Sequence, residues 1–200
     1  MSDAAIPFGL LSADQFLESR PLTHRVELAD GVIYNMSGGT VQHNQIAMNA
    51  VLALGFAARN LGCLLVSNDV ALKVGPSTIY YPDVMAVCDV SDDDKLSRTN
   101  PCFIIEVVSP SSARVDHREK RIAYQAIASM RDYLIVDPDA QKVDHHHREN
   151  ADAWSWIVRH RGGFCATDCL GVLAVDDVGD GTVRCKSTVP WRIPIVHQTR

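Results

Sequence analysis

Residues 103–108 read FIIEVV, and this run carries an acidic residue where a buried strand is expected. Side chains alternate across a strand, so Ile104, Glu106 and Val108 share one face. An ionised carboxylate in such an apolar run is costly unless another group compensates its charge. Val108 cannot stabilise a charge, so we expect a compensating cation for Glu106 to come from another part of the chain.

A second acid lies in a similar setting. Residues 80–87 read YYPDVMAV, with Asp83 directly after a proline. If this strand and the strand of Glu106 are neighbours, both carboxylates reach one point in space. Two unit charges about 4 Å apart repel by roughly 4 kcal/mol at an effective dielectric near 20. A bound divalent cation would turn that repulsion into a ligand set.

The helix expected over about residues 113–128 offers the missing positive charge. Asp116, Lys120 and Tyr124 follow one another at intervals of four residues and so form one stripe along the helix. A short turn before the helix would return it over the strand, which lets Lys120 reach Glu106. A surface ion pair between Asp116 and Lys120 explains the same spacing equally well.

The bulk composition is that of an ordinary globular protein. The chain has 200 residues, 46% hydrophobic and 22% charged, with a formal net charge of −5. No run approaches the ~18 apolar residues of a membrane span, and no signal peptide is evident, so we expect a cytoplasmic protein. Arg114, Arg118 and Arg121 form a local basic cluster that suits contacts with DNA phosphates, although the chain as a whole is acidic.

The order of the expected elements predicts an α/β or α+β fold in one domain, residues 1–200, with its core at about 8–160. No period is readable after Asp176. Apolar spacing, a capping box, an Asp-Gly hairpin turn and glycines set the boundaries. Helices are expected at 12–19, 41–57 and 113–128, and strands at 25–28, 32–36, 64–74, 79–88, 102–108, 133–137, 141–147 and 154–160.

Cysteines and histidines offer a different kind of site. The six cysteines show no Cys-x-x-Cys pair, and free thiols are the favoured interpretation, but Cys165, Cys169 and Cys185 leave a zinc site open. In the run HHH at residues 145–147, His145 and His147 share a strand face, whereas three consecutive histidines cannot bind one ion. A polar edge strand is the favoured interpretation of this run.

Taken together, these residues resemble the Uma-type restriction endonuclease family of the PD-(D/E)xK nuclease superfamily. The similarity covers roughly residues 8–160. The matching elements are Glu27 with Asp30-Gly31, His43, Pro82-Asp83, EVVSPS at 106–111, Asp116, Lys120, Tyr124 and YLIVDP at 133–138.

The resemblance implies a restriction-endonuclease-like core with a mixed central sheet flanked by helices. Asp83 and Glu106 would be ligands of Mg²⁺ (or Mn²⁺), and Lys120 would be the catalytic lysine moved from strand to helix. Glu27 and His43 would be accessory residues of the site. The implied activity is endonucleolytic hydrolysis of DNA, and a homodimer is plausible because duplex cleavage requires attack on two strands.

Two alternatives remain open at this stage. The first is a catalytically silent DNA-binding module that retains the nuclease fold, since Val108 stands where a lysine would follow the acid by two residues. The second is a metal- or small-ligand-binding protein that uses the cysteines and histidines. Glu27 and His43 also have plainer interpretations, as an exposed hairpin residue and a helix-start residue.

Overall fold

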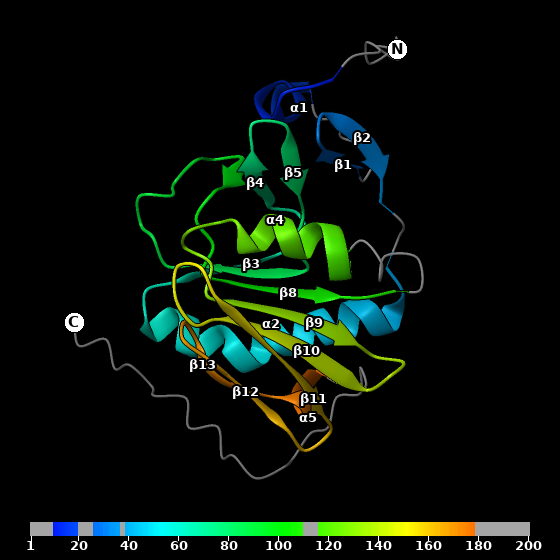
Figure 1. Cartoon of the computed structure of the whole chain (residues 1–200), viewed down its shortest axis with the longest axis vertical. Coiled ribbons are helices and arrows are strands. Elements are labelled where there is room, and N and C mark those ends of the chain that lie inside the picture. The colour runs from blue at the N-terminus through cyan, green and yellow to red at the C-terminus, as the bar shows by residue number, and fades with distance from the viewer. Residues whose placement is uncertain (1–9, 20–25, 37–38, 110–115, 179–200) are drawn as a thin grey trace, which may run out of the picture.

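The structure is a computed structural model that describes residues 10–19, 26–36, 39–109 and 116–178 (Figure 1). At the centre of this described part is a six-stranded sheet. Its strands are β3 (Leu64–Ser67), β6 (Val84–Val87), β8 (Phe103–Val107), β9 (Asp132–Asp137), β10 (Lys142–Arg148) and β11 (Trp154–His160). They lie in the order β11-β10-β9-β8-β6-β3, with β8 parallel to β9 and the other neighbours antiparallel. The expected mixed central sheet is confirmed.

A smaller sheet lies beside the large one and carries the N-terminal hairpin (Figure 1). Its described strands are β1 (Val26–Ala29), β2 (Val32–Asn35), β4 (Ala71–Gly75), β5 (Thr78–Tyr80) and β7 (Ser97–Arg98), in the order β2-β1-β5-β4-β7. Asp30 and Gly31 form the predicted hairpin turn with φ values of 50° and 81°. Helix α1 (Ala13–Ser19) buries Phe16 against this sheet.

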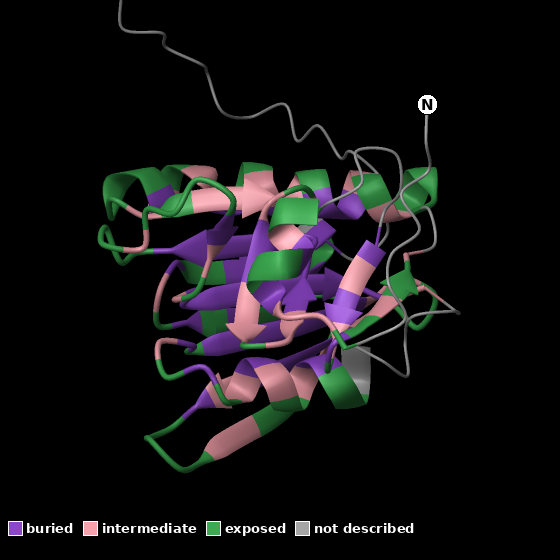
Figure 2. Ribbon diagram, turned by 90° about the horizontal axis from the view of Figure 1, so that it is seen from above, coloured by how far each residue is buried: buried purple, intermediate pink, exposed green. Residues whose placement is uncertain are grey.

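Helices cover the two faces of the large sheet. Helix α2 (Val41–Asn60) packs on one face, together with a hairpin of β12 (Phe164–Thr167) and β13 (Gly171–Ala174) and the short α5 (Val175–Val178). Helix α4 (Arg121–Gln125) packs on the other face. Figure 2 shows the buried strands as a layer between these helices. Among the described residues, no helix is both long and apolar enough to cross a membrane.

Two runs that the sequence predicts as single strands are each broken in the structure. The run 64–74 divides at Asn68, which has a positive φ of 50°, into β3 and β4. The run 79–88 divides at Pro82, which has no N–H for a sheet ladder, into β5 and β6. In both cases one half belongs to the small sheet and the other to the large sheet. Asp83 therefore lies where the chain passes from one sheet to the other.

The helix predicted over 113–128 is shorter than expected at its C-terminal end. Its described part is a π-helical turn, Asp116–Lys120, followed by α4, which ends at Gln125. Arg148 of β10 binds the chain that leaves the helix, and its guanidinium stacks on Trp154 at 4.6 Å. That guanidinium donates hydrogen bonds of 2.7–2.9 Å to the carbonyl oxygens of Gln125, Ile127, Met130 and Ala151.

The expectation that all cysteines are free thiols is wrong for one pair. Cys63 and Cys88 form a disulfide across 25 residues of sequence. The antiparallel register of β3 and β6 explains the disulfide. Leu64 pairs with Val87, so Cys63 before Leu64 stands opposite Cys88 after Val87. Only the pairing of the strands reveals this neighbourhood.

Loss of Arg148 should destabilise the protein, because four carbonyl oxygens would lose a charged donor in a largely buried place. We expect Arg148→Ala to lower the free energy of unfolding by about 3 kcal/mol in urea denaturation. Arg161→Ala is the matched control, since that side chain is 49% exposed and should change stability by less than about 0.5 kcal/mol. Equal effects of the two substitutions would contradict this role of Arg148.

Candidate functional site

The strand pairing brings Asp83 and Glu106 to one face of the large sheet. The register of β6 and β8 ends at the pair Val84–Ile105, so the next step places Asp83 across from Glu106. The backbone N–H of Val107 donates a 2.7 Å hydrogen bond to Oδ2 of Asp83, which joins the two strands at this point. Glu106 lies on the face covered by α4, because it shares that face of β8 with Ile104; Met85, two residues from Asp83, belongs to the same core cluster.

Lys120 lies between two carboxylates. Its Nζ is 3.2 Å from Oε1 of Glu106 and 3.1 Å from Oε1 of Glu27, and its side chain is 7% exposed. The lysine closes the π-helical turn that precedes α4, a kind of local widening that is frequent at functional sites. The sequence left open whether Lys120 reaches Glu106 or forms a surface pair, and the structure places it on Glu106.

Two tyrosines complete this part of the site. The hydroxyl of Tyr124 donates a 2.8 Å hydrogen bond to Oε1 of Glu106. Burial, followed by the charge of Glu106, raises the pKa of Tyr124 well above its usual value, so it remains a hydrogen-bond donor. The ring centroid of Tyr80 lies 5.4 Å from Nζ of Lys120. Burial, followed by the charge of Glu27, raises the pKa of Tyr80 to about 12.

His43 holds the other acid from the start of α2. The hydroxyl of Thr40 accepts a hydrogen bond from the N–H of His43 and so caps the helix. This fixes the first turn, and Nε2 of His43 lies 2.9 Å from Oδ1 of Asp83. Gly39 leaves room for the imidazole, because an added Cβ there would lie 3.1 Å from its ring.

The charges of this cluster favour a bound cation. Glu27, Asp83 and Glu106 contribute three negative charges and Lys120 one positive charge, while His43 is neutral or singly positive. Glu106 and Asp83 are 3% and 8% exposed, so water compensates their charge poorly. Their carboxylate oxygens are hard donors of the kind that Mg²⁺ and Mn²⁺ take. The donor set therefore fits a divalent metal ion.

The other residues that the sequence predicts for the site belong to the helical segment that carries Lys120 or precede it in the sequence. Arg118 is exposed and Arg121 half-buried on the helical segment that carries Lys120. Arg121 lines a shallow hollow together with His146 and Trp156. Arg114 lies outside the described residues, and the structure describes only the backbone of Asp116. The predicted stripe is thus shown for Lys120 and Tyr124 alone.

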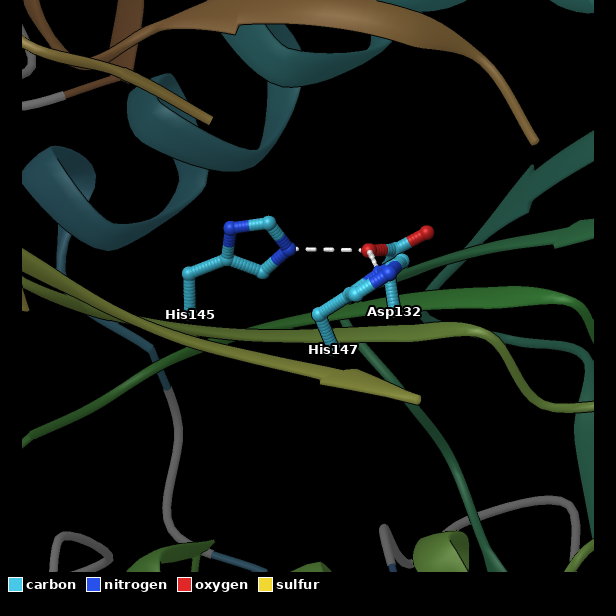
Figure 3. Close-up of side chains that lie close together, drawn as sticks. All are labelled: Asp132, His145 and His147. Carbon is cyan, nitrogen blue, oxygen red and sulfur yellow. Dashed lines mark hydrogen bonds and ion pairs between the residues drawn. The ribbon is translucent and has the colours of Figure 1, made fainter. Parts of the chain in front are cut away.

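A second cluster lies on the opposite face of the large sheet (Figure 3). Nε2 of His145 and Nδ1 of His147 each lie 2.8 Å from Oδ1 of Asp132. Burial lowers the pKa of His147, but the hydrogen bond with Asp132 and its charge outweigh this, so the pKa is raised overall. The interpretation of this run as a polar edge strand is wrong, because β10 lies between β9 and β11.

Sequence reasoning missed Asp132, the residue that joins the two histidines. The register of β9 and β10 places Asp132 directly opposite His147, with His145 two residues away on the same face. A His-x-His pair on one strand of a hairpin, with an acid at the start of the other, is the signal that identifies such a cluster. The thiols of Cys165 and Cys169 belong to no such metal-ligand group in the described part of the chain, and Cys185 lies outside it.

The chain matches a family model and two curated proteins. The model of the Uma2 family, described as "Putative restriction endonuclease", matches residues 13–163. Two uncharacterized proteins of Synechocystis sp. are similar in sequence. One is 27% identical over 150 residues, covering 72% of this chain and 85% of its own length. The other is 28% identical over 151 residues, covering 74% and 80%.

A solved structure shares the fold. It is described as a "putative nuclease belonging to DUF820" from Anabaena variabilis, and it superposes with a TM-score of 0.67. The alignment covers 84% of this chain and 97% of that chain at 14% sequence identity. The described architecture is therefore that of a nuclease-like fold.

Removal of the Lys120 ammonium should leave the repulsion between Glu27 and Glu106 without compensation. We expect Lys120→Met to lower the free energy of unfolding by about 3–5 kcal/mol, because it leaves buried carboxylates without their cation. Adding Glu27→Gln should restore at least about 1 kcal/mol, since it removes one of these charges.

Chemical denaturation of the single and double variants measures this coupling. Lys95→Met serves as the control, because Lys95 is exposed and should contribute less than about 0.5 kcal/mol. A strictly additive double variant would show that Lys120 and Glu27 do not interact.

Proposed function

Since the chain belongs to the Uma2 family, we propose that it is a metal-dependent endonuclease that hydrolyses phosphodiester bonds of DNA. One observation carries this proposal: Asp83 and Glu106 come from neighbouring strands to one sheet face, and the ammonium of Lys120 lies on Glu106 at 3.2 Å. Two acids on neighbouring strands, one of them paired with a lysine, supply the kinds of charge that phosphodiester hydrolysis requires.

Asp83 and Glu106 would hold Mg²⁺ or Mn²⁺. Such an ion polarises the phosphate and lowers the pKa of a bound water. The hydrogen bonds of Asp83 to Val107 and to His43 fix the orientation of its carboxylate before any ion arrives. A ligand that is already oriented loses less conformational entropy on binding.

Lys120 is the residue that would stabilise negative charge on the scissile phosphate. Glu27 and Glu106 keep its ammonium in place. The hydroxyl of Tyr124 orients the carboxylate of Glu106 in turn. The strand position of the usual lysine is taken by Val108, and the helix following the same strand supplies the amine instead.

The DNA backbone would pass over the helical segment that carries Lys120. Arg118 and Arg121 lie on this segment and supply positive charge next to an acidic site. Arg114, which precedes them in the sequence, is a further candidate for a phosphate contact. Contacts of this kind position the duplex without reading its sequence. A homodimer with two such sites would allow both DNA strands to be cleaved.

Plasmid nicking tests the catalytic role directly. We expect nicking of supercoiled DNA in Mg²⁺ or Mn²⁺, and its loss with a chelator. Asp83→Asn and Glu106→Gln should lower the rate by at least about 100-fold, and Lys120→Met by about 100- to 1,000-fold. Each substitution removes a charge from the reacting centre.

Matched controls come from exposed acids of the same types. Asp139→Asn and Glu18→Gln should nick at the rate of the unaltered protein, because both side chains lie on the surface. Equal nicking by all variants would show that the activity belongs to a contaminant. Binding of DNA without any cleavage would instead support the catalytically silent module.

Salt dependence tests the basic surface independently of cleavage. We expect Arg118→Gln and Arg121→Gln each to weaken DNA binding and to reduce the slope of log K against log salt by about 1. Fluorescence anisotropy in the presence of a chelator measures this without hydrolysis. Arg59→Gln is the control, because Arg59 lies in the last turn of α2 on the other side of the sheet. An unchanged slope in both variants would exclude this surface from the interface.

A further inference from the structure

The cluster of Asp132, His145 and His147 has the composition of a metal site and lies apart from the proposed nuclease centre. Asp132 shares its face of β9 with Leu134, and the two histidines share their face of β10 with Val143; both apolar residues belong to the core on the α2 side. The cluster therefore lies on the opposite sheet face from Glu106. Figure 3 shows its three side chains pointing together toward the side of α2.

We propose that Asp132, His145 and His147 bind a divalent transition-metal ion, Zn²⁺. One ligand atom from each residue lies within 4.8 Å of the others. Imidazole nitrogens suit Zn²⁺ and its neighbours in the first transition row, whereas Mg²⁺ and Ca²⁺ prefer oxygen donors. Two imidazoles and one carboxylate form a three-ligand set of the type that leaves a coordination position for water.

The distances are close to those that coordination needs. Ligand atoms around a tetrahedral zinc ion at about 2.0–2.1 Å are separated by about 3.3 Å. The two nitrogen–oxygen distances of 2.8 Å must therefore open by about 0.5 Å. Rotations of the Asp132 carboxylate and the His147 imidazole can supply a change of this size.

The surroundings of the cluster favour a bound ion over a solvated charge. Asp132 is fully buried, and its Oδ2 accepts a 2.9 Å hydrogen bond from the N–H of Asp168. This bond holds the carboxylate with Oδ1 toward the histidines, as an outer partner of a metal ligand does. His147 is 26% exposed, which gives an ion and its water a way in.

The alternative is a set of histidine–carboxylate hydrogen bonds that serves packing alone. That arrangement explains the 2.8 Å distances without an ion, but it gives no reason for Zn²⁺ to bind at one equivalent per chain. Stoichiometric Zn²⁺ binding that is lost in a His147 variant but kept in an Asp83 and Glu106 double variant therefore separates the two.

The test is a titration of the full chain, stripped of metal with a chelator, with ZnCl₂ by calorimetry and with CoCl₂ by visible absorption. We expect one Zn²⁺ per chain with a Kd of about 1 µM or below, and a Co²⁺ spectrum of low coordination number. An excess of Zn²⁺ about 100-fold over Kd should raise the Tm by about 5–10 °C.

The neighbouring histidine provides the matched control. His147→Gln should weaken Zn²⁺ binding by at least about 100-fold, whereas His146→Gln should not, because His146 points to the other face and stacks between Tyr133 and Trp156. The pair Asp83→Asn with Glu106→Gln should bind Zn²⁺ normally, which separates this site from the nuclease centre. No stoichiometric binding by the unaltered chain, or equal loss in the His146 and His147 variants, would overturn the proposal.

Discussion

The ammonium of Lys120 connects three separate parts of the molecule. It contacts Glu27 on a strand of the small sheet and Glu106 on a strand of the large sheet, and it belongs to the turn that begins α4. Both contacts are largely shielded from water, so solvent cannot replace either ion pair if it is broken. The relative position of the two sheets and the helix is therefore tied to the same atoms that form the candidate nuclease centre.

A break in a strand gives this centre its second acid. Pro82 separates the small-sheet strand β5, which ends at Tyr80, from the large-sheet strand β6, which begins at Val84. Asp83 thus stands at the first position beside β8, where the N–H of Val107 meets its carboxylate at 2.7 Å. The proline lacks the N–H of a regular strand residue, and the aspartate that follows it is held by the N–H of the residue next to Glu106.

The two faces of the large sheet carry different chemistry. The face under α4 gathers carboxylates, tyrosine hydroxyls and the ammonium of a lysine. The face under α2 gathers two imidazoles on one carboxylate. Side chains alternate along β9 and β10, so His146 and Tyr133 point to the face opposite that of Asp132, His145 and His147. The two sets of ligands therefore lie on different faces of one sheet.

The sequence determined the elements whose signals are local. The Asp-Gly turn of the first hairpin, the capping box of the first helix and the apolar run of β8 depend on neighbours within a few residues, and the structure contains all three. The resemblance to a nuclease family indicated further residues of the site, and the structure brings Lys120 and Tyr124 to Glu106 and Glu27 to Lys120.

Strand register and sheet membership were decided only by the tertiary structure. The runs 64–74 and 79–88 each divide between two sheets, which a hydrophobic pattern cannot show because both halves are equally apolar. The disulfide of Cys63 with Cys88 and the meeting of Asp132 with His147 both follow from which residues stand opposite each other across strands. A pattern along one strand records which side chains share a face, but it carries no information about the partner strand that faces them.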